Sequence, residues 1–215
     1  VITFSTETGG SLNTGDIPVY LTFAGTSSKG YNLIGNPYPS HLTWTKTFVD
    51  NNASLIEPSI YYRTTTGTAN NQTGWSFKTI NASTGEVSPL GTSNTIPPMQ
   101  AFWIRAKASG VLTLNSDLTK SHNASNPLKA PATKNADRQR LRLQIDNGTA
   151  IDEAVIYFDA AASDAYDRYD SPKFNEANTV TQIYTTAGTE KLVINGMSTI
   201  PLNQEIGLGF VPGSA

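Results

Sequence analysis

The chain has 215 residues, contains no cysteine and carries a formal net charge of −2 at pH 7. The missing cysteines exclude thiol nucleophiles, cysteine-ligated zinc and iron–sulfur clusters. The near-neutral charge argues against nucleic acid as a partner, and no apolar run approaches the roughly 18 residues of a membrane-spanning helix, so we expect no membrane insertion. Charged residues make up only 15% of the chain. This low fraction, with abundant Thr, Asn, Ser and Gly, is typical of a β-rich extracellular protein.

Short segments of alternating polarity follow one another through the first half of the chain. We expect strands at residues 1–4, 17–23, 31–34, 60–64, 75–80, 101–106 and 111–114. Glycines between the first two segments predict a hairpin, and residues 101–106 predict a central strand. Partial helical spacing of the apolar residues in 41–57 predicts one or two turns of helix.

The second half also consists of short segments of alternating polarity. We expect strands at residues 140–146, 153–158, 181–185, 191–194 and 205–211. The Asp146-Asn147-Gly148 turn joins the first two of these strands as a β-hairpin, and residues 160–169 predict one helical turn. The fold class is therefore all-β, an antiparallel β-sandwich of jelly-roll type.

A polar, proline-bearing segment divides the chain. We expect two packed β subdomains, residues 1–125 and 138–215, joined by residues 126–137 as a linker or crossover. A single continuous sandwich is the alternative. Residues 1–137 carry nine basic and seven acidic side chains and residues 138–215 carry six and ten, so net charges of +2 and −4 predict a weak attraction. Because Val1 opens the chain and the last strand ends near its end, we expect the parent protein to extend beyond this segment.

Residues 30–40 read Gly-Tyr-Asn-Leu-Ile-Gly-Asn-Pro-Tyr-Pro-Ser. Pro37 and Pro39 fix their own φ and push the residues before them toward extended geometry. The segment therefore predicts a stiff corner after a strand. Such a corner either plugs one end of a β-sandwich or forms a binding surface.

This corner resembles a signature of large secreted or surface-displayed proteins of Bacteroidetes-type bacteria, which the type IX system often exports. Further matching segments follow in the same order at residues 96–104, 152–158, 169–173 and 206–210. The resemblance implies an extracellular or outer-surface location and an adhesin-like role. It implies no catalytic residues.

Aromatic residues are the main candidates for ligand contact. Sugar-binding modules place flat aromatic rings against the apolar face of a pyranose ring, and Tyr38, Trp44, Tyr62 and Trp75 could do so. We expect Tyr38 and Trp44, which flank the corner, to be the first pair to test. The alternative is that these rings supply the hydrophobic core.

Catalytic constellations are poorly supported. A Ser–His–acid triad would have to use His41 or His122, the only histidines. Asp164, Asp167 and Asp170 are spaced by three and could bind Ca²⁺, the one cofactor that the sequence suggests. A solvated acidic loop is the alternative, and a hydrolase that uses two of these carboxylates is a weaker one.

Together these features predict a non-enzymatic cell-surface or secreted module, adhesin-like or a structural spacer of a larger exported protein. A carbohydrate-binding module attached to a polysaccharide-degrading enzyme is the alternative. The expected partners are a glycan, a host or cell-surface protein, and other domains of the parent chain.

Overall fold

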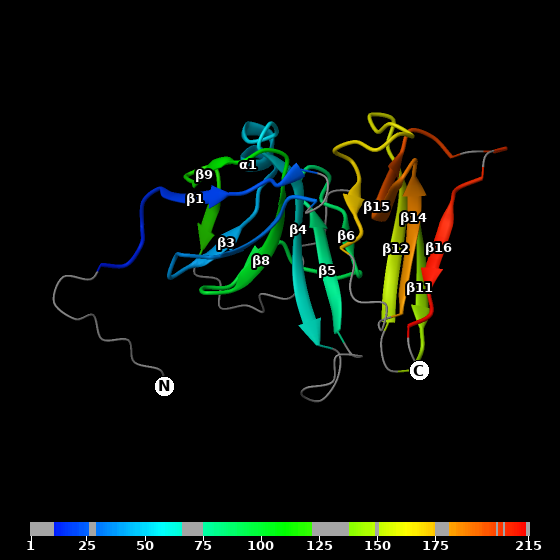
Figure 1. Ribbon diagram of the computed structural model, residues 1–215, viewed down its shortest axis with the longest axis horizontal. Coiled ribbons are helices and arrows are strands. Elements are labelled where there is room, and N and C mark those ends of the chain that lie inside the picture. The colour runs from blue at the N-terminus through cyan, green and yellow to red at the C-terminus, as the bar shows by residue number, and fades with distance from the viewer. Residues whose placement is uncertain are drawn as a thin grey trace.

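The computed structural model describes residues 11–25, 29–65, 75–121, 138–148, 151–174, 181–200, 202–203 and 205–213. Within these ranges the chain consists of β-strands and one short helix, arranged as several largely antiparallel sheets. The predicted all-β, sandwich-like fold is thereby confirmed. Figure 1 shows the sheets of the first half on one side of the molecule and the sheet of the second half on the other.

The first half forms three sheets. Strands β1 (Ile17–Leu21) and β9 (Gly110–Leu114) pair with each other, and a second sheet has the order β10 (Thr119–Ser121), β3 (His41–Thr43), β7 (Thr95–Ile96). The third and largest has the order β2 (Tyr31–Gly35), β8 (Ala101–Ala106), β4 (Ile56–Thr65), β5 (Trp75–Asn81), β6 (Val87–Ser88). Helix α1 (Lys46–Asn51) follows β3, and the Thr45 hydroxyl caps it by accepting a hydrogen bond from the Phe48 amide.

The second half forms one sheet with the order β11 (Arg140–Asp146), β12 (Ile151–Phe158), β15 (Glu190–Met197), β14 (Gln182–Ala187), β16 (Leu208–Val211). Strand β13 (Ser171–Pro172) pairs with β15 as well. The pairing of β12 with β15 is parallel, which corrects the expectation of a wholly antiparallel fold. Among the described strands, no pairing crosses from the first half to the second.

Both faces of the five-stranded sheet are covered, so side chains that alternate along its strands are buried on either side. One face supplies Ile60, Tyr62, Ile80, Phe102 and Ile104 to the core of the first half. The opposite face meets the second half. There the Phe174 ring lies against four rings of this sheet, with centroids 4.3 Å from both Tyr31 and Phe77, 5.3 Å from Trp103 and 5.7 Å from Tyr61. Adjacent tyrosines 61 and 62 can therefore both be buried while pointing in opposite directions.

The corner at residues 35–40 plugs the core of the first half. The Tyr38 hydroxyl lies 2.9 Å from the Gly15 carbonyl and 2.8 Å from the Leu114 carbonyl, which ties the corner to β9. The side-chain amide of Asn36 donates hydrogen bonds to the carbonyls of Ser40 and Ile96. Neither Gly35 nor Asn36 has a positive φ. The stiffness comes instead from the prolines and from these side-chain hydrogen bonds.

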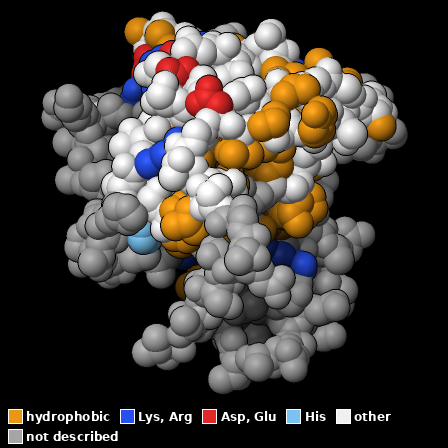
Figure 2. Space-filling view, turned by 90° about the vertical axis from the view of Figure 1, so that its left-hand side faces the viewer, with side chains coloured by type: hydrophobic (Ala, Val, Ile, Leu, Met, Phe, Trp, Pro, Cys, Tyr) orange, Lys and Arg blue, Asp and Glu red, His pale blue; other side chains and the backbone are white. Residues whose placement is uncertain are grey.

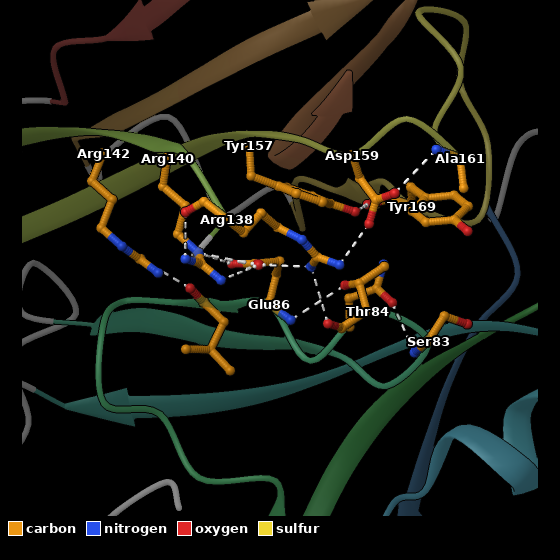
Figure 3. A network of polar contacts seen from close by, with 12 residues as sticks. Ser83, Thr84, Glu86, Arg138, Arg140, Arg142, Tyr157, Asp159, Ala161 and Tyr169 are labelled. Atoms are coloured by element: carbon orange, nitrogen blue, oxygen red, sulfur yellow. Dashed lines mark hydrogen bonds and ion pairs between the residues drawn. The ribbon is translucent and has the colours of Figure 1, made fainter. Parts of the chain in front are cut away.

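Buried ion pairs join the two halves (Figure 3). The Glu86 carboxylate in the first half accepts hydrogen bonds from Arg138 Nη1 at 2.9 Å, Arg140 Nε at 2.8 Å and Arg140 Nη2 at 2.8 Å. Only 2% of the Glu86 side chain is exposed. Arg138 also donates to Asp159 of its own half. A buried carboxylate is stable only when it is paired in this way, so these contacts fix how the halves meet.

A second buried carboxylate lies beside the first. Glu153 of β12 accepts from Arg142 Nη1 and Gln144 Nε2 of β11, and the Ser88 hydroxyl of β6 lies 3.2 Å from it. Arg142 also donates to the Val87 carbonyl. Together, the two carboxylates bind β6 to the β11–β12 hairpin.

The strand expectations differ from the structure in several places. The hairpin partner expected at residues 1–4 lies outside the described residues, and β1 pairs instead with β9, about ninety positions later in the chain. Residues 160–169 form bends and turns rather than a helical turn. Five short strands, β3, β6, β7, β10 and β13, were not expected. With only two or three residues each, they carry too little alternation to be recognised.

Candidate functional site

A pocket of about 280 Å³ opens in the first half between three segments of the chain. Residues 43–46, at the end of β3 and the start of α1, form one wall. Residues 80–87, from the end of β5 to β6, form another, and the loop residues Thr92 and Asn94 complete the lining.

The predicted ligand residue Trp44 lines this pocket. Its ring is only 1% exposed and packs edge-on against Phe48 and Phe102, with centroids 4.7 and 5.4 Å away. The indole nitrogen is buried and has no hydrogen-bond partner in the described structure. Trp44 is therefore a core residue that also borders the pocket.

Of the other aromatic residues predicted to contact a ligand, Tyr38 and Tyr62 are buried. The expectation that Tyr38 and Tyr62 lie on the surface is wrong, because they are 1% and 9% exposed, respectively. Burial raises the pKa of both hydroxyls, and Asp16 raises that of Tyr38 further. Tyr38 is held by backbone carbonyls, and Tyr62 faces the first core. The side chain of Trp75 lies outside the described residues.

The pocket has a rigid frame. The Trp44 amide donates to the Asn94 carbonyl at 3.4 Å, which joins the first wall to the loop. Asn81 donates from its side chain to the carbonyls of Arg168 and Asp170, at 3.1 and 3.0 Å, which anchors the second wall to the other half. The pocket is thus built by contacts that exist without a ligand.

Polar and apolar groups both line the pocket. Ile80, Ala82, Val87 and the Trp44 ring are apolar. Thr43 and Asn94 are half-buried, and their side chains make no hydrogen bond with other described residues. Lys46 lies at the pocket and pairs with Asp50 one helical turn later. Such a mixture suits binding through hydrogen bonds and one apolar contact.

The predicted calcium ligands lie in one loop but serve a different purpose. Asp164 Oδ1 accepts from the Ser198 amide and hydroxyl, at 3.1 and 2.9 Å. The Asp167 carboxylate accepts from the amides of Ser163 and Tyr169, at 2.9 and 2.6 Å.

Asp170 is also held by backbone donors, the amides of Asp167 and Gly196, each at 2.8 Å. No group of three or more carboxylates and histidines in the described part of the chain is placed to hold a metal ion. The structure does not group Asp164, Asp167 and Asp170 as a cation site, because their oxygens face separate backbone N–H groups. Burial raises the pKa of Asp170 to about 7, against the lowering effect of its two backbone donors.

Within the described part of the chain, no hydrogen bond joins His41 to a serine hydroxyl or a carboxylate. His41 lies in β3, where it pairs with Ser121, and His122 falls outside the described residues. No described helix is long and apolar enough to cross a membrane.

Sequence reasoning identified Trp44 but missed the rest of the pocket. Thr43, Lys46 and Asn94 belong to segments that meet only in the folded chain. No local motif marks them, so no signal in the sequence could have grouped them.

The chain matches one family model, described as "Domain of unknown function (DUF8693)", over residues 2–214. The comparisons with curated proteins and with solved structures found no match.

Proposed function

The chain belongs to the DUF8693 family, and we propose that it serves as a non-enzymatic module of a secreted or surface-displayed protein, with an adhesin-like or spacing role. The proposal depends on how the side chains of the chain are used. In this proposal the buried charged groups stabilise the fold, and the exposed surface and the pocket bind partners.

The observation that carries the proposal is the engagement of the buried carboxylates. Glu86 and Glu153, which are both buried, are bound by Arg138, Arg140 and Arg142. A carboxylate whose oxygens already accept hydrogen bonds from arginine side chains is not free to contact a substrate. These groups instead hold the two halves in one arrangement, which a spacer or display module needs.

An exposed apolar surface supports a binding role. Figure 2 shows hydrophobic side chains gathered on the face at the left of Figure 1, where β1 and β9 lie. Tyr20 and Val111 are paired across these two strands and are 79% and 50% exposed. Contiguous exposed apolar groups often mark interaction sites.

The proposed location depends on the resemblance of residues 30–40 to exported Bacteroidetes proteins, and the low charged fraction agrees with it. The direct test is protease treatment of intact cells of the source bacterium, followed by detection with an antibody against this domain. Loss of the signal from intact cells is expected. A signal that resists protease until the cells are lysed would contradict surface display.

The absence of catalysis has its own test. Purified protein is incubated with panels of chromogenic glycosides, esters and peptides. We expect no turnover above that of a sample without protein. Turnover that disappears in a variant of one carboxylate or histidine would contradict the proposal.

A carbohydrate-binding module is the second candidate function. The pocket beside Trp44 favours it, because the pocket combines apolar groups with amide and hydroxyl side chains. Binding through this pocket is compatible with either a freestanding adhesin or a module attached to a polysaccharide-degrading enzyme.

A further inference from the structure

We propose that the pocket beside Trp44 binds a single neutral, hydroxyl-rich ring, such as the terminal sugar of a glycan. This inference deepens the second candidate function and depends on it. It assigns to that function a site, a ligand size, a ligand charge and two contact residues.

The size of the pocket limits its occupant to one ring. Its volume is about 280 Å³, which lies just below the roughly 300–1,000 Å³ of pockets for drug-sized ligands. One pyranose with its exocyclic groups is of suitable size. The remainder of an oligosaccharide would have to lie outside.

The lining has the two kinds of surface that a sugar presents. Ala82 is half-buried and offers an apolar group to the C–H face of the ring, whereas Trp44 and Ile80 are 1% exposed and present almost no surface to it. Asn94 offers an amide with both donors and an acceptor, and Thr43 offers a hydroxyl that can do either. Both side chains lack a partner among the described residues, so a ligand hydroxyl would not have to displace an existing protein hydrogen bond.

The charges at the pocket favour a neutral ligand. Lys46, the one charged residue of the described lining, is bonded to Asp50. Asp50 also pairs with Arg168, so two cations share this one carboxylate, and it is the competitor that an anion at Lys46 would meet. An anionic ligand would have to compete with Asp50 for Lys46, whereas a neutral sugar would not.

The pocket is also preorganised. Two of its walls are joined by the hydrogen bond from Trp44 to Asn94, and the third segment is anchored through Asn81 to the loop at residues 168–170. A preformed site does not lose affinity to ordering on binding. Because the contact with one ring is small, we still expect weak binding, and because the site is preformed we expect it to be specific.

The indole N–H of Trp44 provides a reporter. The chain has three tryptophans, which give three indole signals in a ¹H–¹⁵N NMR spectrum, and through-bond assignment identifies that of Trp44. Glucose, galactose, mannose and N-acetylglucosamine are titrated to millimolar concentrations, with glucuronate and glycine as charged probes. We expect at least one neutral sugar to shift the Trp44 signal in a saturable manner, and the charged probes to leave it unchanged.

Two conservative variants test the contacts. Asn94→Ala removes an amide, and Thr43→Val removes a hydroxyl while keeping the shape of the side chain. Each should raise the dissociation constant of the active sugar about three- to tenfold, the usual effect of one lost neutral hydrogen bond. Asn203→Ala, at an exposed position in the second half, is the matched control and should bind as the parent chain does. Circular dichroism and the unchanged positions of the other two indole signals establish that each variant is folded.

Each other outcome overturns the inference. A panel of neutral sugars that leaves the Trp44 signal in place would show that the pocket takes no such ring. Binding of glucuronate alone would assign an anionic ligand. Binding that neither variant weakens would place the site elsewhere. None of these results alters the cell-surface and turnover tests, so failure here is distinguishable from failure of the proposed surface role.

Discussion

Replacement of Glu86 by glutamine should weaken the contact between the two halves of the molecule and lower the free energy of unfolding. The carboxylate is 2% exposed and accepts three charge-assisted hydrogen bonds of 2.8–2.9 Å from Arg138 and Arg140. Glutamine keeps the size of the side chain but removes its charge and replaces one acceptor with a donor. Two arginines are then left facing an amide.

The expected cost follows from the burial of the partners. Removing one member of a buried ion pair typically costs about 3–5 kcal/mol, because the other charge remains desolvated. Here Arg138 keeps its bond to Asp159 at 2.6 Å, and the two arginine side chains are 16% and 19% exposed. The lower end, about 3 kcal/mol, is therefore expected for Glu86→Gln.

Urea denaturation followed by circular dichroism measures this difference in the free energy of unfolding. Asp50→Asn is the matched control, since its pair with Arg168 also joins the halves but the two side chains are 34% and 42% exposed. That variant should lose less than about 1 kcal/mol. A loss below about 1 kcal/mol for Glu86→Gln, or equal losses for both variants, would refute the role given to burial.

Three further outcomes are expected. The free energy of unfolding should fall as the pH rises from about 4 to about 7, because the folded chain holds a proton on Asp170, whose pKa is raised to about 7 from an ordinary 3.8. The contribution is on the order of 4 kcal/mol, and a slope that persists unchanged in Asp170→Asn would assign it to other groups. Tyr38→Phe should cost about 1 kcal/mol in urea denaturation, because it removes the hydroxyl between the Gly15 and Leu114 carbonyls; a neutral result would show that the corner holds without this bond. The melting temperature should be the same with EDTA as with added Ca²⁺, because the loop aspartates bind backbone amides, and a rise of several degrees with Ca²⁺ would restore the metal site.

The alternating segments of the sequence predict the longer strands well. The predicted bounds of β8 and β11 match those in the structure, and β5 and β9 differ by one residue. Alternation works here because each strand has one face in a core. It cannot identify partners, and the pairing of β1 with β9 depends on contacts between distant segments.

The contact between the halves shows a second limit. A tally of charges predicts attraction between a positive first half and a negative second half. The buried contact instead uses an acid of the first half, Glu86, and arginines of the second, Arg138 and Arg140. Short-range pairing of desolvated groups outweighs net charge, which is screened over about 10 Å.

The aromatic predictions show a third limit of reasoning from the sequence. Tyr38, Trp44 and Tyr62 have the composition of a sugar platform, but their rings pack with many aliphatic side chains in the core of the first half. An aromatic residue in a strand can face a core on either side of a sheet, and the sequence does not show that the five-stranded sheet is covered twice. The pocket arises where three segments fail to close completely around Trp44.

The most direct test of binding without bond-making is to recover the ligand. The protein is incubated with neutral oligosaccharides that carry the sugar active in the NMR titration, the complex is separated by ultrafiltration, and the bound fraction is analysed by mass spectrometry. We predict that the oligosaccharide is retained by the chain, is retained less by Asn94→Ala, and is released with its mass unchanged. Shortened oligosaccharides in the bound or free fraction would contradict the proposed non-enzymatic function, and retention equal to that of an unrelated β-sandwich would contradict the proposed sugar site.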